Sequence, residues 1–513
     1  MTMTSFSTLY NGQALGLDKI PLLSPGVFRE AVLHAVQGGA RISAFFGAPE
    51  ERLQERVGRS EAPERGIRLF AVLSRDTEAQ LALASTLVEG SYPALTPECP
   101  QANWFEREIH EQWGVVPEGH PWLKPIRFHA SYAPGQSGPG PAIGVTDFFR
   151  IDGAEIHEVA VGPVHAGIIE PGHFRFQCHG EEVLHLEISL GYQHRGIEQA
   201  LIGGPGPRTM HYMETLAGDT TIGHATAYAQ AMEALTGCRV TPRAFALRGI
   251  ALELERAANH TGDLGALAGD VGFLPTASYC GRIRGDFLNM TGLLCGSRFG
   301  RGFISSGGVG FDLEEQRAGQ LLERLERAFK DVTNAVNLLW ETPSVMARFE
   351  RTGTVTLETA EDLGLVGPAA RASGLVRDAR YDFPSGIYRF AQMPVSTWDT
   401  GDVFGRAYVR WLELQRSIEF IRGQIEMLPS GDGMAELKTT APNSLAVSLV
   451  EGWRGEICHV AITDGQGCFS RYKIVDPSFH NWIGLAMALR GQQISDFPLC
   501  NKSFNLSYCG HDL

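Results

Sequence analysis

Apolar residues that recur at three- and four-residue spacing predict long helices beyond residue 220. They fall near 223–235, 243–267, 312–340 and 402–428. In the third, Glu323, Arg327 and Lys330 are expected to face solvent while the opposite face is buried. That apolar face consists of Leu321, Leu325, Phe329, Val332, Val336 and Leu339. Four such helices predict a helical bundle.

Strand-like patterns flank the predicted bundle on both sides. Residues 182–189 are expected to form a strand before it. After it, 455–462 and 468–475 surround a turn-rich loop, Thr463-Asp-Gly-Gln-Gly467, which is typical of a β-hairpin. A central bundle with strand-rich N- and C-terminal parts follows.

The first 130 residues predict a smaller α+β unit. Helices are expected at 27–37 and around 77–87, a strand at 67–73, and a further element at 103–113. The glycines and prolines of 131–141 cannot sustain a helix or a central strand, so they predict a linker. The fold class is therefore α+β, in four parts: an N-terminal extension (1–24), the small domain (25–130), a Pro/Gly-rich linker (131–147) and a large domain (148–513).

The composition of the chain excludes several classes of protein. The 513 residues carry a formal charge of -14, which argues against nucleic-acid binding because phosphate contacts need clustered Lys and Arg. No apolar run approaches the roughly 20 residues that cross a bilayer, and the N-terminus lacks a secretion signal. We expect a cytoplasmic chain whose membrane link runs through partners. The nine cysteines are odd in number and contain no C-x-x-C pair, so reduced thiols are expected.

A loop rich in glycine, histidine and glutamate is the first candidate for chemistry. It spans 162–176 and carries His165, Glu170, His173 and Arg175. Closely spaced His and Glu can relay protons or bind a metal, and glycines let backbone approach a ligand. The alternative is a set of loop histidines satisfied by backbone groups.

These residues carry a family resemblance. Gly162–Phe176 and Gly191–Glu198 resemble signatures of group 4, energy-converting [NiFe] hydrogenase large subunits, which are similar to the large quinone-site subunit of respiratory complex I. Residues 102–121 resemble the neighbouring small complex I subunit, which is fused to the large one in some bacteria. The motifs at 371–374, 401–404, 476–481 and 496–498 extend the likeness to the C-terminus.

The resemblance implies where nickel and iron ligands would stand. Such hydrogenases hold these metals with four thiolates in two C-x-x-C pairs, because soft sulfur suits them. Counting from His224 puts the first pair at Ala217 and Thr220. The second falls at Ser507 and Gly510, with Cys509 out of register by one. No metal is therefore expected in this chain, and an active hydrogenase with atypical ligands stays an alternative.

Complex I relatives have lost the same thiols and receive a quinone in the vacated cavity. The family's quinone-binding histidine maps onto His173, whereas its tyrosine, counted back from His224, falls at Gly218. Tyr192, Tyr212 or Tyr228 could supply a phenol, although core packing is the commoner role of an aromatic residue. The expected cavity lining is His173, Tyr228, Ser507 and Cys509.

Charged residues could form a polar path from this cavity toward a membrane partner. The candidates are Glu170, Arg175, Glu198, Glu214 and Asp219. Glu198 and Glu214 could equally be helix-surface carboxylates. Arg248, Glu255, Arg256 and His260 lie at helical spacing, which favours intrahelical pairs or interface contacts over a site. The expected catalytic set is His165, Glu170, His173, Arg175, Asp219 and His224.

Three functions remain open: electron transfer to a quinone or another acceptor coupled to ion movement, an active hydrogenase, and a non-catalytic coupling subunit. The resemblance implies as partners a small subunit with a [4Fe–4S] cluster, ferredoxin-like iron–sulfur proteins, and antiporter-like membrane subunits. This chain itself is expected to bind no cofactor besides a possible quinone. It would lie peripherally on the cytoplasmic side of the cell membrane.

Overall fold

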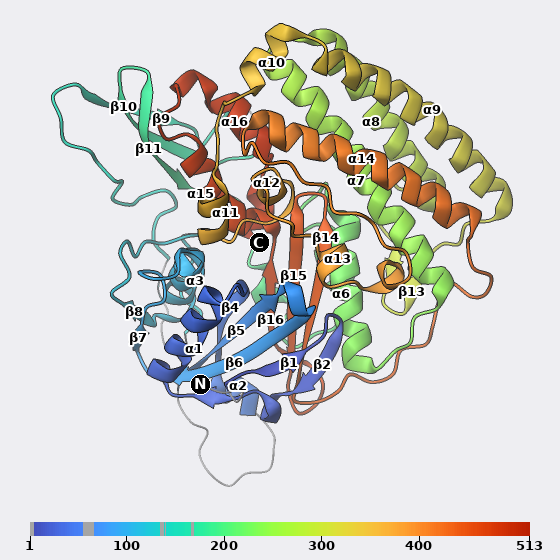
Figure 1. Cartoon of the computed structure of the whole chain (residues 1–513). Helices are drawn as coiled ribbons and strands as arrows, with labels where there is room; N and C mark the ends of the chain where they lie inside the picture. The colour runs from blue at the N-terminus through green and yellow to red at the C-terminus, as the bar shows by residue number, and fades with distance from the viewer. Residues whose placement is uncertain (1–4, 55–65, 134–137, 139, 166–168) are drawn as a thin grey trace.

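The computed structural model describes residues 5–54, 66–133, 138, 140–165 and 169–513. A sheet formed by the N-terminal part lies beside a second sheet from the C-terminal part, and a bundle of long helices packs against the second sheet (Figure 1). A small hairpin sheet projects from the opposite side. Apolar side chains of these layers form one large continuous core.

The N-terminal sheet has the strand order β1-β6-β5-β4, and β3 pairs in parallel with β6. Its strands are β1 (Ser7–Leu9), β3 (Leu22–Leu23), β4 (Arg41–Pro49), β5 (Ile67–Arg75) and β6 (Gln80–Val88). Helices α1 (Pro25–Gln37) and α3 (Asn103–Trp113) pack on it. Every residue of β4 is buried, because helix and sheet cover both of its faces.

The C-terminal sheet recruits a strand from the start of the chain. Its order is β16-β15-β14-β2, all antiparallel. The strands are β2 (Gln13–Gly16), β14 (Ser444–Gly452), β15 (Gly455–Thr463) and β16 (Phe469–Val475). The predicted hairpin is therefore present as β15 and β16. Because β1 and β3 lie in one sheet and β2 in the other, the N-terminal segment joins the two.

The helical bundle is confirmed, with one helix more than the sequence predicts. It consists of α6 (Thr221–Thr236), α7 (Pro242–Asp270), α8 (Leu274–Cys295), α9 (Glu315–Trp340) and α14 (Val403–Glu426). The α+β class and the bundle with strand-rich flanks are as predicted. On α9 the expected apolar face is buried, with Phe329 partly so, and Glu323, Arg327 and Lys330 are exposed.

The predicted helix around 77–87 is wrong. This segment forms strand β6 after a short 3-10 turn, η2 (Asp76–Glu78). Its leucines and alanines favour a helix in isolation, but β6 lies between β5 and β1 in the sheet, where nearly every side chain is buried. Tertiary burial overrides local propensity here.

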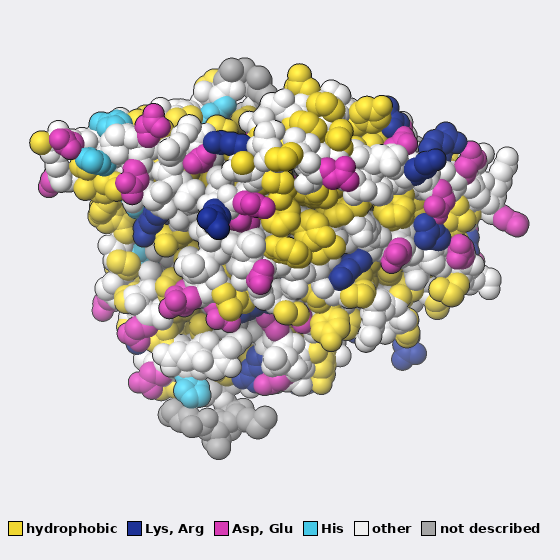
Figure 2. Space-filling view, turned by 45° about the horizontal axis from the view of Figure 1, so that its top comes forward, with side chains coloured by type: hydrophobic (Ala, Val, Ile, Leu, Met, Phe, Trp, Pro, Cys, Tyr) yellow, Lys and Arg dark blue, Asp and Glu magenta, His cyan; other side chains and the backbone are white. Residues whose placement is uncertain are grey.

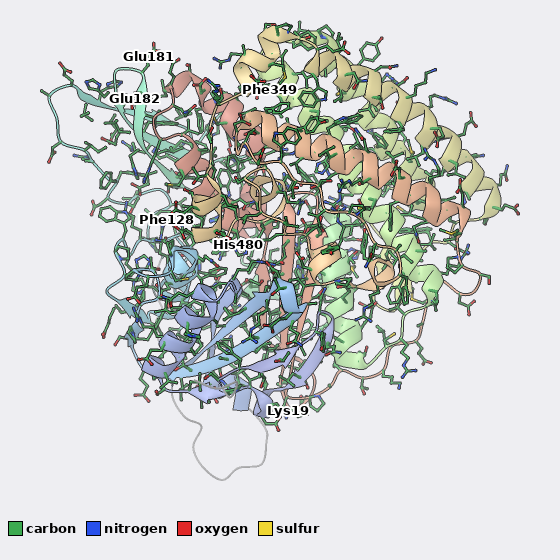
Figure 3. All side chains as sticks on the ribbon, viewed as in Figure 1. Lys19, Phe128, Glu181, Glu182, Phe349 and His480 are labelled. Carbon is green, nitrogen blue, oxygen red and sulfur yellow. The ribbon has the colours of Figure 1, made fainter. Side chains whose placement is uncertain are left out.

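The hairpin sheet and the short C-terminal helices complete the fold. The sheet orders β11-β10-β9, from β9 (Ile156–Val161), β10 (His173–His179) and β11 (Glu182–Ser189), with Glu181 and Glu182 at its tip (Figure 3). Behind it pack α15 (Pro477–Ala488), α16 (Phe497–Phe504) and α17 (Tyr508–Asp512). The remaining short elements are α2 (Glu50–Gln54), β7 (Ser91–Pro93), η3 (Pro100–Ala102), β8 (Val116–Glu118), α4 (Ile197–Ala200), α5 (Thr209–Glu214), β12 (Ile304–Ser305), β13 (Gly308–Val309), α10 (Pro343–Phe349), α11 (Leu357–Asp362), α12 (Gly367–Arg371), α13 (Ala379–Asp382), η4 (Gly386–Arg389) and η5 (Ile494–Asp496).

One face of the molecule carries a band of hydrophobic side chains across its middle, with Lys, Arg, Asp and Glu scattered around it (Figure 2). None of the helices in the described part of the chain is long and apolar enough to cross a membrane.

Candidate functional site

Three helix starts surround the cavity that the resemblance singles out. Thr220 directly precedes α6, Asp476 caps α15 by accepting a hydrogen bond from the Ser478 amide at 2.8 Å, and Ser507 caps α17 by accepting one from the Gly510 amide at 2.9 Å. Caps of this kind satisfy amides that the first helical turn leaves free. Thr220 and Ser507 are two of the four positions at which the resemblance expects cysteines, and both carry hydroxyl groups.

Asp476 occupies the space that a side chain at position 510 would need. A Cβ atom built on Gly510 would lie 2.7 Å from the Asp476 Oδ2 atom and 2.9 Å from the Ser507 Oγ atom. At the other pair of positions, the Thr220 hydroxyl accepts a hydrogen bond from Trp453 Nε1 at 3.1 Å. Ala217 is fully buried. The cavity wall is filled with hydrogen-bonded protein groups at these positions.

A buried column of hydrogen bonds runs from Asp476 into the C-terminal sheet. His224 Nε2 lies 3.0 Å from Asp476 Oδ2, His224 Nδ1 lies 3.1 Å from His459 Nε2, and His459 Nδ1 lies 3.0 Å from the Tyr472 hydroxyl. Burial raises the pKa of Asp476, but the hydrogen bonds from His224 and Ser478 and the charges of His224 and Arg454 together outweigh burial, so the pKa falls below its usual range. Burial and the neighbouring His224 hold the pKa of His459 far below the usual value.

The pKa shifts of Asp476 and His459 indicate which atoms of this column carry protons. Because Asp476 is ionised, His224 donates to it from Nε2. His459 is neutral, so one of its ring nitrogens donates and the other accepts in the hydrogen bonds to His224 and Tyr472. Asp476 and His224 lie in motifs that the sequence shows, whereas His459 and Tyr472 stand on neighbouring strands and no spacing rule connects them.

Asp219 and Arg454 form the second polar group at the cavity. The Arg454 guanidinium donates to both carboxylate oxygens of Asp219, at 2.7 and 2.8 Å, and stacks 3.9 Å from the centre of the Trp453 ring. Burial raises the pKa of Asp219, but Arg454 outweighs it and the pKa falls. Arg454 also donates to the Asn505 carbonyl at 2.5 Å, so it ties α6 to the C-terminal helices.

Glu255 lies next to this pair and carries a displaced pKa. Its carboxyl group accepts hydrogen bonds from the amides of Ile222 and Gly223, at 2.7 and 3.1 Å. Burial, which outweighs these hydrogen bonds, and the nearby Asp219 raise the pKa of Glu255 to about 8. Both carboxylates, together with Asn259 and Arg298, line a small pocket of about 10 Å³, close to the least space that holds one water molecule. Glu255 is therefore no intrahelical partner, and helical spacing did not indicate this role.

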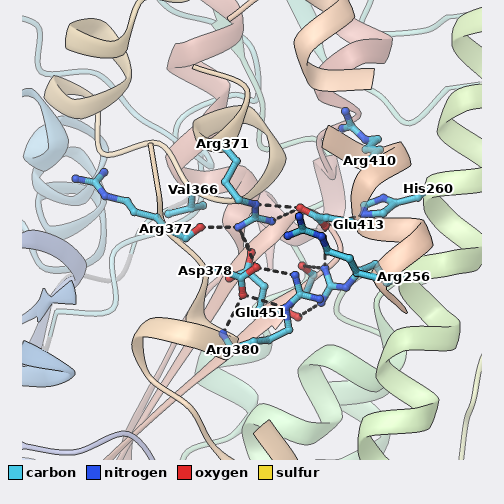
Figure 4. Close-up of polar contacts among 12 residues, drawn as sticks. Arg256, His260, Val366, Arg371, Arg377, Asp378, Arg380, Arg410, Glu413 and Glu451 are labelled. Carbon is cyan, nitrogen blue, oxygen red and sulfur yellow. Dashed lines mark hydrogen bonds and ion pairs between the residues drawn. The ribbon is translucent and has the colours of Figure 1, made fainter. Parts of the chain in front are cut away.

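A second polar cluster is a network of ion pairs that is buried between α7, α14 and β14 (Figure 4). Arg371 donates to Glu413 at 2.7 Å and to Glu451 at 2.8 Å, and His260 Nε2 lies 2.9 Å from Glu413. Arg256 adds an ion pair with Glu253 at 3.0 Å within α7. Further members are Asp378, Arg380, Tyr388 and Ser417. Each buried charge has a partner, as low-dielectric surroundings require.

Among the described residues of the 162–176 segment, Glu170 and Gly172 contact Tyr508 at the start of α17. Glu170 Oε2 accepts a hydrogen bond from the Tyr508 amide at 3.4 Å, and a Cβ on Gly172 would lie 2.5 Å from the Tyr508 ring. Burial and the adjacent Glu170 raise the pKa of the Cys509 thiol to about 12. Glu170, Ser507 and Cys509 are thus brought together near Asp476.

His165, His173 and Arg175 form a separate group at the N-terminal end of β10, the middle strand of the hairpin sheet. His165 Nε2 contacts the Gly172 carbonyl at 2.9 Å. His173 Nδ1 contacts the Gly162 carbonyl at 3.2 Å, and its Nε2 accepts from Arg175 Nε at 3.2 Å. Both ring nitrogens of His173 are engaged, so the tautomer carries its proton on Nδ1.

Other predicted residues lie elsewhere. Tyr228 is buried in a small apolar core beside Tyr472, with ring centres 6.3 Å apart. Glu198 and Glu214 are buried and not helix-surface carboxylates: Glu198 pairs with Lys473 and Arg471, and Glu214 accepts from the Gly302 amide.

These residues do not fit a [NiFe] centre. The four positions offer no thiolate, and the Asp476 carboxylate takes the space beside Gly510. In the described part of the chain, no group of three or more His, Cys, Asp or Glu side chains is placed to hold a metal ion. The donor set is that of a hydrogen-bonded polar site.

Family comparisons agree with this architecture. The family described as the 49 kDa subunit of respiratory-chain NADH dehydrogenase matches residues 270–448 and 436–512. The family described as its 30 kDa subunit matches residues 51–138.

Individual relatives come from two kinds of complex. Formate hydrogenlyase subunit 5 of Escherichia coli (strain K12) is 29% identical over 93% of this chain and 85% of its own length. The carbon monoxide-induced hydrogenase of Rhodospirillum rubrum is 31% identical over 68% of this chain and 97% of its own. NADH-quinone oxidoreductase subunit 4 of Thermus thermophilus is 30% identical over 67% and 90%.

A solved structure has the same fold. A chain of the membrane-bound sulfane sulfur reductase, an archaeal respiratory membrane complex, superposes with a TM-score of 0.66 at 23% identity, covering 71% of this chain and all of that one. The chain therefore belongs to the family of the 49 kDa subunit of respiratory NADH dehydrogenase and the related group 4 hydrogenase large subunits, with a 30 kDa subunit-like part fused before it.

Proposed function

We propose that this chain is the large subunit of a membrane-associated oxidoreductase complex that works without nickel. It takes electrons from a [4Fe–4S] cluster of a partner subunit, passes them to a quinone or another small acceptor, and couples this transfer to ion movement. The single observation that carries the proposal is the rebuilt cavity wall, in which Asp476 stands beside Gly510 where a thiolate would be needed.

Arg175 and His173 are the groups we assign to the acceptor. His173 accepts from Arg175 at Nε2 and donates from Nδ1 to a carbonyl, so His173 offers no free N–H to a quinone oxygen. The Arg175 guanidinium, which also pairs with Glu158, supplies the donors at this site. His173 then acts by orienting Arg175. With glycine at the family's tyrosine position, no phenol donates from there.

Glu255 is the group we assign to proton handling. A carboxyl group whose pKa is about 8 holds its proton at neutral pH and releases it when a nearby charge changes. Asp219 faces the same pocket and is held ionised by Arg454. A change of charge in the cavity would therefore be transmitted to Glu255 through Asp219. Glu170, which contacts the Tyr508 amide and lies next to Cys509, is the second carboxyl group we assign to this path.

A non-catalytic coupling subunit is the second candidate. The Asp476 carboxylate, which leaves no space for a metal, also favours this second candidate. Together with His224 and His459 it fills part of the expected cavity with buried side chains. In that case the polar network only holds the soluble and membrane arms of a complex together.

The test uses the purified complex that contains this chain. Nickel content, hydrogen-dependent dye reduction and quinone-dependent dye reduction are measured for the natural chain and for His173→Ala. The matched control is His179→Ala, an exposed histidine on the same strand. We expect no stoichiometric nickel, no hydrogen uptake, and quinone reduction that His173→Ala lowers at least tenfold.

Other outcomes decide between the alternatives. Stoichiometric nickel with hydrogen uptake would overturn the assignment and restore the hydrogenase. Loss of all redox activity from an intact complex would favour the coupling subunit. Equal activity of both histidine variants would remove His173 and Arg175 from the acceptor site.

A further inference from the structure

A pocket outside the cavity lies where three parts of the chain meet. Helix α3 of the N-terminal part, strand β11 of the hairpin sheet and helix α15 line an open pocket of about 340 Å³. Small-molecule sites typically measure about 300–1,000 Å³. None of the residues assigned above to the acceptor or to proton handling lines it.

The walls of this pocket are mostly apolar and aromatic. Trp104 and Trp482 lie at its buried side, with Ile483, Ala486 and Met487 of α15. Trp122 and Phe149 are 44% and 40% exposed, and their ring centres lie 6.2 Å apart at its edge. Two adjacent aromatic rings left open to solvent beside a hollow are typical of a ligand surface.

The charged groups at this pocket are predominantly cationic. Arg107 donates to the carbonyls of Lys124 and Pro125, at 3.0 and 2.8 Å, and no carboxylate of the described residues lies within ion-pair distance of it. Burial lowers the pKa of Arg107 to about 10. Arg490 is exposed at the rim. Glu187 is neutralised by Lys124, 2.5 Å away, which leaves the positive charges of Arg107 and Arg490 in excess.

We infer that this pocket binds an anionic amphiphile, a molecule with an apolar body and one phosphate or carboxylate head. The body packs among Trp104, Trp122 and Phe149, and the head pairs with Arg107 and Arg490. An anion held by a partly desolvated guanidinium gains charge-assisted hydrogen bonds that carbonyl acceptors do not supply. A membrane lipid and a free metabolite of this chemistry satisfy the site equally.

Binding is tested with decyl phosphate by calorimetry on the purified full-length chain, and again on the intact complex. The natural chain is compared with Arg490→Gln, which removes a rim charge, and with Ala486→Trp, which fills the pocket without changing charge. The control is Arg327→Gln on the exposed face of α9. We expect saturable binding at one site, at least tenfold weaker in the two pocket variants and for neutral decanol, and unchanged in the control.

Vesicles distinguish the two sources. Capture by phosphatidylglycerol vesicles, absent with phosphatidylcholine and weakened by Arg490→Gln, assigns the site to a lipid. Decyl phosphate binding without vesicle capture assigns it to a free amphiphile. Absence of saturable binding, or equal affinity in all variants, overturns the inference. Binding that the isolated chain shows and the intact complex lacks also overturns it, because a partner polypeptide then covers the pocket.

Discussion

At the scale of single residues, buried polar groups fill the surroundings of the positions at which the resemblance expects thiolates. The Asp476 carboxylate takes up the space beside Gly510. His224, Ser478 and Arg454 compensate its charge through hydrogen bonds and a nearby cation. An empty space at this place would cost stability.

Gly510→Ala tests whether Asp476 fills this space. The added methyl group would lie 2.7 Å from the Asp476 carboxylate, so we expect the free energy of unfolding to fall by about 1–3 kcal/mol, as for other overpacked sites. Gly218→Ala is the matched control, since a Cβ there meets nothing within 4 Å. Chemical denaturation of both variants checks this. Equal stability of the two would show that the cavity is still open beside position 510.

Glu255 should make stability depend on pH in a defined direction. Its pKa rises from an ordinary 4.5 to about 8 on folding, so the folded chain holds a proton that the unfolded chain releases. The unfolding free energy must therefore fall as pH rises toward 8, by roughly 1.4 kcal/mol per pH unit at most, and level off above it. Glu255→Gln removes this slope.

Unfolding measured between pH 6 and 9 for the natural chain and Glu255→Gln gives the comparison. Glu253→Gln on the same helix is the control. Burial raises the pKa of Glu253, but Arg256 and Arg380 outweigh it, so this carboxylate stays ionised across that range and its difference curve should be flat. A flat curve for Glu255→Gln as well would show that Glu255 is ionised when folded.

At the scale of elements, sequence patterns predict the parts that have one-sided burial or a distinct turn. Helix α9 has a clear period, whereas the fully buried β15–β16 hairpin is marked by its turn-rich loop. Both were predicted within a few residues. Strand β6 was taken for a helix because both of its faces are buried and its leucines and alanines hide the two-residue period. Helix α8 was not predicted, since glycines at 281, 285 and 292 lower its helix propensity and only packing on α7 and α9 stabilises it.

Some residues of the candidate site could be predicted from the sequence, and others could not. Motif residues such as His173, Glu170 and His224 could be named from the sequence. The pairing of His224 with Asp476 and His459, and of Asp219 with Arg454, could not be predicted, because more than 200 residues separate the two partners of each pair. A buried pair formed across such a distance leaves no spacing to read.

The N-terminal strand pair depends on one buried side chain. Asn11 donates to the carbonyls of Phe383 and Leu449 at 2.8 and 2.9 Å, and accepts from the Leu449 amide at 2.8 Å. Asn11→Ala would leave these buried groups without partners, so we expect a loss of at least about 2 kcal/mol in unfolding free energy. Gln13→Ala, an exposed neighbour on β2, should change it by less than about 0.5 kcal/mol. Comparable losses would mean that backbone pairing alone holds β2.

At the scale of the whole molecule, the two fused parts are joined by buried charges as well as by apolar contacts. Lys473 of β16 lies 2.7 Å from both carboxylate oxygens of Glu108 on α3, and 3.1 Å from Glu198. Arg127 and Arg471 complete the group. His480 lies at the same junction, where its ring packs against Phe105 of α3 (Figure 3). A 30 kDa-like part joined in this way should not separate from the large part without cost.

Lys473→Met measures that cost. It removes a buried cation from two carboxylates while keeping the apolar stem, so we expect unfolding free energy to fall by about 3 kcal/mol. Amide exchange should then quicken in both α3 and β16, because Glu108 and Lys473 stabilise one element each across the junction. Lys330→Met, on the exposed face of α9, is the control and should change neither quantity. If Lys473→Met is as stable as the control, the charges at the junction contribute nothing net, and apolar packing such as that of His480 on Phe105 holds the two parts together.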